Sequence, residues 1–135
     1  MTNKEIAKAW FASIDSNDFN GIKKLMDSKH TFHNPMTPSP VGTDQHLGMM
    51  QMMTSSFKGK HHLELLISEN EYVGVKGTWK GTHTGEFNGI PATNKPVEFS
   101  FTDIFHIVNG KVADEYFEMN PMAIMAQIGA APVNA

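Results

Sequence analysis

Asp103 has the sequence surroundings that point most directly to chemistry. It falls in residues 97–108, a stretch in which alternate side chains share one face of a strand. The other positions on its face are apolar: Phe99, Phe101, Phe105 and Ile107. Because an ionised carboxylate is costly to bury among such side chains, we expect a raised pKa for Asp103, as at many acid/base sites. The alternative is a structural carboxylate bonded to a backbone amide or a helix end.

A second acidic candidate, Glu115, lies in the last strand-like stretch, residues 111–119. Glu115, Phe117 and Met119 alternate along this stretch and therefore share one face. If that face points inward, Glu115 supplies a second carboxylate to the site. If it points outward, Glu115 is a solvated charge.

Histidine supplies further candidates. His33 has an unperturbed pKa of ~6.5 and is a candidate base, and Asn34 beside it is a candidate polar group of a pocket. His83 ends a face that is apolar up to Trp79, and we expect it near the rim. For both histidines the alternative is a structural hydrogen bond.

No metal site held by the protein is expected. His61 and His62 are adjacent on a strand and point to opposite faces, and no HxH or HExxH spacing occurs. The cluster Met49, Met50, Met52 and Met53 is more typical of an adaptable apolar wall than of a copper site. The side chains expected to contact a bound molecule are Trp10, Asn34, Met53, Trp79, His83, Phe101, Phe117 and Met119.

Composition narrows the classes of function. The 135 residues contain no cysteine, which excludes disulfides, thiol nucleophiles, iron–sulfur clusters and cysteine zinc sites. All 11 cations are lysines, so the planar guanidinium that grips phosphate or carboxylate in two places is missing. With a formal charge of −3, this argues against a nucleic-acid groove. No cofactor is expected.

The ends of the chain suggest a simple organisation. Glu5 and Lys8 interrupt any apolar signal segment, and no apolar run approaches the ~18 residues that a membrane span needs. We therefore expect a cytoplasmic protein without a membrane partner. Residues 1–130 are expected to form one domain, and residues 131–135 a loose tail.

The elements that must position these residues follow from capping signals and periodicity. Thr2 with Glu5, Asp18, and Thr43 or Asp44 start three helices, and Asn120 before Pro121 starts a short terminal one. Strands are predicted at residues 31–34, 61–68, 72–84, 97–108 and 111–119, with Asn109-Gly110 as a hairpin turn. This order is typical of an α+β domain with a curved antiparallel sheet and helices packed on one face.

Several segments resemble those of one known family. Residues 81–97, GTHTGEFNGIPATNKPV, closely resemble the signature of SnoaL-like polyketide cyclases, and residues 103–112 and 125–129 resemble the segments that follow it. Phe32-His33-Asn34-Pro35 sits where the wider nuclear-transport-factor-2-like superfamily places its first strand. The resemblance implies a cone-shaped curved antiparallel sheet, a cystatin-like α+β barrel, with the N-terminal helices on its concave face around an apolar pocket. It also implies a homodimer formed through the outer sheet face.

The sequence departs from the family where the catalytic acid is expected. Such cyclases usually carry histidine-tryptophan at Glu115-Tyr116 and aspartates at Phe117 and Asn120, one of which is the general acid/base. Phenylalanine and asparagine cannot replace it. The related ketosteroid isomerases need a carboxylate base and a tyrosine where this chain has Asn34 and Trp10, so steroid isomerisation by that mechanism is rejected.

Two functions remain in view. In the first, a small apolar polyketide, phenolic or steroid-like molecule is bound, and Asp103, with Glu115 or His33, catalyses aldol-type cyclisation or isomerisation. In the second, the fold is a non-catalytic ligand-binding or dimerisation module, which would account for Phe117 and Asn120. Epoxide hydrolysis is a weaker third function, because the chain lacks the arginine of an aspartate–arginine–aspartate set.

Overall fold

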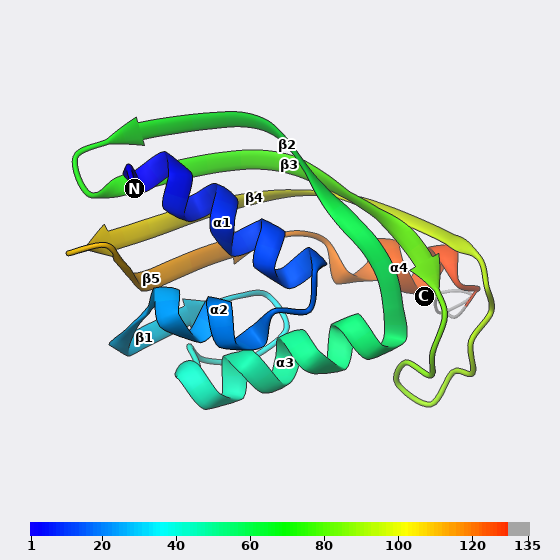
Figure 1. The fold of residues 1–135 in the computed structure, drawn as a ribbon. Helices are drawn as coiled ribbons and strands as arrows, with labels where there is room; N and C mark the ends of the chain where they lie inside the picture. The colour runs from blue at the N-terminus through cyan, green and yellow to red at the C-terminus, as the bar shows by residue number, and fades with distance from the viewer. Residues whose placement is uncertain (130–135) are drawn as a thin grey trace.

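A single curved sheet with helices on its concave side organises residues 1–129, which a computed structural model describes (Figure 1). The strand order is β1-β5-β4-β3-β2. In chain order the elements are α1 (Asn3–Asp15), α2 (Phe19–Leu25), β1 (Met26–His33), α3 (Thr43–Ser56), β2 (Phe57–Glu69), β3 (Tyr72–His83), β4 (Pro96–Val108), β5 (Lys111–Glu118) and α4 (Pro121–Gln127). No helix within residues 1–129 combines the length and apolar character needed to cross a membrane. The predicted tail, residues 131–135, lies outside the described residues.

The predicted helix starts are confirmed. At α1, the Glu5 amide donates to Thr2 Oγ1 at 3.1 Å and the Thr2 amide donates to Glu5 Oε1 at 2.8 Å, which completes a capping box. Asp18 caps α2 through the Gly21 amide, and Asn120 caps α4. These local hydrogen bonds fix the starts of α1, α2 and α4, whereas α3 begins at Thr43 after Gly42 without a side-chain cap.

Strand β1 differs from the sequence-based expectation. It begins at Met26 rather than near Thr31, and it pairs in parallel with β5, so the sheet is mixed rather than wholly antiparallel. Strands β2 to β5 form the predicted antiparallel meander, joined between β4 and β5 by Asn109 and Gly110 at positive φ. A hairpin turn has a local sequence pattern that predicts an antiparallel strand pair. A parallel pair is joined by a long connection, and no short sequence pattern predicts which strands will pair.

The register of the sheet decides which side chains face the helices. On the inner face, Val75, Asp103 and Phe117 form one cross-strand row, and Val73, Phe105, Glu115 and Phe32 form the next. On the outer face, Gly74, Ile104, Tyr116 and His33 lie in line. Trp10 of α1 packs on Phe105 with ring centroids 5.7 Å apart. The inner rows therefore form the floor on which α1 and α3 sit.

The segment between β3 and β4 is tied to the end of α3. The amides of Thr84 and Gly85 donate to the Ser56 carbonyl at 2.9 and 3.0 Å, and Ser56 Oγ donates to the Glu86 carbonyl at 2.6 Å. A Cβ at Gly85 would collide with the Ser55 backbone, so a glycine is required at this close approach. Residues 84–86, which belong to the segment 81–97 discussed above, are thus hydrogen-bonded to the end of α3.

The inner and outer faces of the sheet make a testable contrast. Phe105 is 0% exposed and its neighbour Ile104 is 47% exposed. We expect Phe105→Ala to lower the free energy of unfolding by about 3–5 kcal/mol, because it removes buried aromatic surface and leaves a cavity. Glu118→Ala, a control at an exposed position of the neighbouring strand β5, should cost under about 1 kcal/mol. Urea denaturation of both variants measures this, and equal costs would contradict the assigned faces.

Candidate functional site

A cavity of about 650 Å³ lies between the helices and the inner face of the sheet. Its wall is mainly apolar, with α1 contributing Trp10, Phe11 and Ile14. The methionines that line it are Met36, Met49, Met50, Met53, Met119 and Met125. Exposed polar side chains border it as well: Asn17, Lys58, Lys60 and Asn88. The cavity is therefore an apolar chamber with a polar border.

Two carboxyl groups, Asp103 and Glu115, lie together in the wall of this chamber. They are 1% and 3% exposed, and both line the cavity. They come from neighbouring strands at diagonal positions, because Asp103 pairs with Phe117 and Glu115 pairs with Phe105. Asp103 Oδ1, Asp103 Oδ2 and Glu115 Oε1 are buried and receive no hydrogen bond from any described residue. Three carboxyl oxygens are thus left without a donor beside an apolar cavity.

Burial controls the protonation of this pair. Burial, and after it the charge of the neighbouring Glu115, holds the pKa of Asp103 well above its usual value. Burial also raises the pKa of Glu115 to about 7. Asp103 is therefore a neutral carboxylic acid, able to donate a hydrogen bond, and Glu115 is close to its midpoint at neutral pH. Two carboxyls whose environments separate their pKa values are typical of an acid/base pair.

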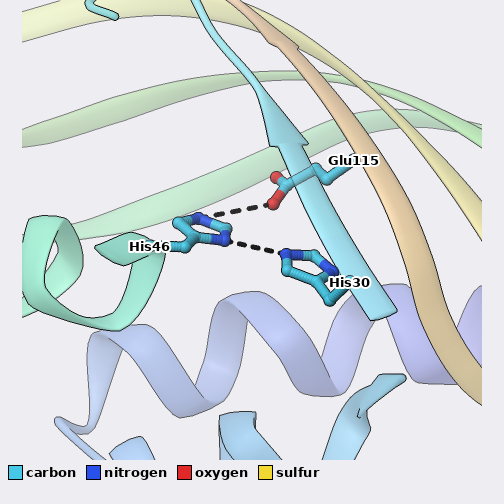
Figure 2. Close-up of side chains that lie close together, drawn as sticks. All are labelled: His30, His46 and Glu115. Atoms are coloured by element: carbon cyan, nitrogen blue, oxygen red, sulfur yellow. Dashed lines mark hydrogen bonds and ion pairs between the residues drawn. The ribbon is translucent and has the colours of Figure 1, made fainter. Parts of the chain in front are cut away.

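A buried pair of histidines adjoins Glu115 (Figure 2). His46 of α3 lies between its partners: its Nδ1 is 2.9 Å from His30 Nε2, and its Nε2 is 3.7 Å from Glu115 Oε1. His30 Nδ1 donates to the Val112 carbonyl at 2.9 Å. The His46 ring stacks on Phe32 with centroids 3.6 Å apart. A row of polar groups therefore runs from the backbone of β5 through two imidazoles to a carboxyl in the cavity.

Both imidazoles are neutral at physiological pH. Burial lowers the pKa of His30, and burial together with the nearby His30 lowers the pKa of His46 to about 2. Neither His30 nor His46 was singled out from the sequence as a site residue. The missed signals were periodicities: His46 precedes Met50 by one helical turn, and His30 shares the strand face of Phe32.

His30, His46 and Glu115 also offer donor atoms within 4.8 Å of one another, a donor set that suits zinc. Their present geometry favours hydrogen bonding instead. His46 Nδ1 and His30 Nε2 are occupied by their mutual hydrogen bond, so a metal ion held by both rings would have to displace it or use another nitrogen.

The remaining predicted site residues divide into two groups. Lining the cavity are Trp10, Met53, Trp79, Phe117 and Met119, along with the two acids. The residues His33, Asn34, His83 and Phe101 are not among its lining. His33 lies on the outer face of the sheet, where its ring stacks on Tyr116 at 4.3 Å. The reason is strand parity: Phe32 points inward, so its neighbour points outward.

The other three have structural contacts in this fold. Asn34 Oδ1 accepts from the amides of Met36 and Thr37, which closes a turn. His83 Nδ1 accepts from the Thr93 amide at 3.2 Å and lies 2.9 Å from Thr93 Oγ1. Phe101 is buried in the core, between Phe11 and Phe117.

The raised pKa of Glu115 makes its contribution to stability dependent on pH. A group whose pKa rises on folding, here from 4.5 to about 7, stabilises the fold below pH 4.5 and loses that contribution as pH climbs to about 7. We expect the free energy of unfolding of the wild type to fall relative to that of Glu115→Gln by roughly 3 kcal/mol across this window.

Denaturation at a series of pH values measures this difference, in which the opposite contributions of His30 and His46 largely cancel. Glu118→Gln, which changes an exposed carboxyl on the same strand, is the matched control. Parallel curves for wild type and Glu115→Gln would show that Glu115 ionises normally.

Several solved structures share this architecture. A search of the curated proteins finds no match. AclR from Streptomyces galilaeus, a proposed hydroxylase, is 21% identical with a TM-score of 0.87, over 96% of this chain and 97% of that chain. Wild-type IdmH from Streptomyces antibioticus, a proposed polyketide cyclase, is 18% identical with a TM-score of 0.86, over 96% and 99%. The structure of a proposed SnoaL-like polyketide cyclase from Jannaschia sp. CCS1 is 20% identical with a TM-score of 0.85, over 96% of this chain and 93% of that chain.

The TM-scores of these three structures establish a shared fold. The sequence match goes further, because the model of the SnoaL-like polyketide cyclase family covers residues 4–128. The resemblance carried by residues 81–97 therefore extends over nearly the whole sequence, and the chain belongs to the SnoaL-like polyketide cyclase family.

Proposed function

We propose that this protein binds an apolar, carbonyl-bearing ring compound in its cavity and catalyses an aldol-type closure or an isomerisation by acid/base chemistry. The observation that carries the proposal is the pair Asp103 and Glu115: buried carboxyls without hydrogen-bond donors, facing an apolar cavity of about 650 Å³. An orphaned pair of this kind costs stability, and such a cost is typical of functional sites. Polyketide, phenolic and steroid-like molecules fit the apolar wall.

The two acids suit different parts of the reaction. Asp103, held neutral, donates a hydrogen bond to the carbonyl oxygen that gains charge as the new carbon–carbon bond forms. Glu115, close to its midpoint at neutral pH, can give or take up a proton during the reaction. The enclosing wall holds the reacting carbons near each other, which lowers the entropic part of the barrier.

The replaced acid of the last strand is consistent with this assignment. Phe117, where the family usually has an aspartate, lies directly across from Asp103 in the sheet. Both residues line the cavity, so a carboxyl at position 103 reaches the same part of the chamber from the neighbouring strand. The acid function is then supplied by β4 and by Glu115 rather than by position 117.

A binding screen followed by a proton-exchange assay tests this function. Thermal shift with polycyclic phenols, steroids and aromatic ketones, 1-tetralone and anthrone among them, should identify stabilising ligands. For a ketone that binds, we expect the protein to accelerate deuterium exchange at the acidic carbon in D2O, as followed by NMR.

Asp103→Asn and Glu115→Gln should each reduce that exchange by about 100-fold, the usual size of an acid/base contribution, while binding persists. Glu118→Gln is the matched exposed control. Binding without exchange would identify a non-catalytic ligand-binding module, and the absence of any binding would contradict the whole proposal.

We also propose that the protein forms a homodimer through the outer face of the sheet. Large apolar side chains are exposed on this face: Leu65 at 51%, Ile67 at 59%, Tyr72 at 47%, Ile104 at 47% and Tyr116 at 40%. Ile67, Ile104 and Tyr116 lie along one row of the register, in which Gly74 separates Ile67 from the adjacent pair Ile104 and Tyr116. A patch of this kind is typical of protein interfaces.

Sedimentation velocity tests the dimer. Ile104→Lys, which places a charge at the centre of the patch, should convert a wild-type dimer to monomers without unfolding it, because a buried unpaired charge is costly. Ser100→Lys, at an exposed position further along the same face, should remain dimeric. A monomeric wild-type protein at working concentration would contradict the proposal.

A further inference from the structure

The histidine pair beside Glu115 has a protonation pattern that follows from its hydrogen bonds. The Val112 carbonyl can only accept, so the proton of a neutral His30 must lie on Nδ1. Its Nε2 is then bare and can only accept, and His46 Nδ1, 2.9 Å away, must donate to it. A neutral His46 therefore has a bare Nε2. The backbone of β5 thus determines, through two rings, which nitrogen of His46 is free.

The bare nitrogen of His46 points toward the site. His46 lines the cavity, and its Nε2 lies 3.7 Å from Glu115 Oε1. Stacking on Phe32, with the ring planes 5° apart, and the hydrogen bond to His30 hold the ring in this orientation (Figure 2). Asp103 and a protonated Glu115 are both donors, so His46 Nε2 is the one group of this cluster that can accept a proton in that state.

We propose that His46 is a further catalytic residue, the proton acceptor of this site, and that His30 is a positioning residue that fixes the tautomer of His46. The inference rests on the proposed acid/base function and adds the base that two protonated carboxyls lack.

The proton balance of an aldol closure can be followed through these groups. His46 Nε2 takes the proton from the carbon next to a carbonyl, and the electron pair of that C–H bond forms the new carbon–carbon bond. The π electrons of the attacked carbonyl move to its oxygen, which takes the proton of Asp103. Glu115 then reprotonates Asp103, and the His46 imidazolium reprotonates Glu115. Every group returns to its starting state, and no oxidant or reductant is needed.

Because a group with a low pKa is a weak proton acceptor, His46 can fill this role only where its imidazolium is stabilised. Burial keeps His46 unprotonated at rest, which is the form a base requires. As the carboxyls give up a proton, a negative charge develops on Glu115, whose Oε1 lies 3.7 Å from His46 Nε2. Once Glu115 has passed its proton to Asp103, that charge stabilises the imidazolium until the proton returns to Glu115, because opposite charges attract strongly in a buried site.

The tautomers can be measured on the unmodified protein without any substrate. Two-bond ¹H–¹⁵N correlation spectra of ¹⁵N-histidine-labelled protein, assigned through bonds, distinguish protonation at Nδ1 from protonation at Nε2. Between about pH 5.5 and 8.5, where an unperturbed imidazole titrates, we expect His30 and His46 to stay neutral and protonated on Nδ1. A proton on His46 Nε2, or an imidazolium at rest, would overturn the proposal. A joint shift of both rings with one equivalent of Zn²⁺ would do so too, because it would identify a metal site.

Variants test the catalytic consequence in the ketone exchange assay. His46→Phe, which keeps an aromatic ring stacked on Phe32, should lower exchange by about 100-fold. His30→Phe should lower it by about tenfold and leave His46 in mixed tautomers. His30→Gln, whose amide oxygen can accept from His46 Nδ1, should recover part of that loss. Undiminished exchange in His46→Phe would overturn the assignment.

The two proposals can fail separately. If the wild-type tautomers are as expected but no bound ketone exchanges, the acid/base function is wrong while the orientation of His46 stands. If exchange occurs and depends on Glu115 but His46 carries its proton on Nε2, the function stands and His46 is not the base.

Discussion

The burial of two neighbouring carboxyl groups, Asp103 and Glu115, is the main physical constraint on this structure. Asp103 and Glu115 can lie side by side in an apolar wall only if protons neutralise them, and burial raises both pKa values accordingly. Their adjacency depends on the register of β4 against β5, since a shift by one residue would place the two acids on opposite faces of the sheet. The helices that cover the inner face complete the desolvation, so fold and site stability are linked.

The composition of the chain reinforces that constraint. Because the sequence has no arginine, no guanidinium can stabilise the ionised form of the buried carboxyls. The lysines that border the cavity, Lys58 and Lys60, are exposed. Methionine supplies much of the wall, and its flexible thioether adapts to ligands of varied shape. The result is a chamber of low polarity whose wall contains a few groups able to carry a proton.

The sequence-based predictions succeeded where the physics is local. The Thr2–Glu5 capping box, the Asn109-Gly110 turn and the inward placement of Asp103 among phenylalanines each depend on a few neighbouring residues. For Glu115 the sequence left two faces open, and the β4–β5 register decided for the inner one. His33 was placed in the site although it stacks on Tyr116 on the outer face, because a short strand before a proline-rich loop gives little indication of its parity. The parallel pairing of β1 with β5 was missed for want of any local signal.

The sequence by itself determined the family and the order of the helices and strands. It also determined which functional groups are available to the site, namely carboxyls and imidazoles but no thiol and no guanidinium. Only the tertiary structure decided which of these groups meet. His30, His46 and Glu115 come from β1, α3 and β5, and they lie together because the parallel β1–β5 pair and the packing of α3 bring distant segments into contact. Hydrogen bonding and desolvation then set their protonation. Both depend on three-dimensional neighbours rather than on residues adjacent in the chain.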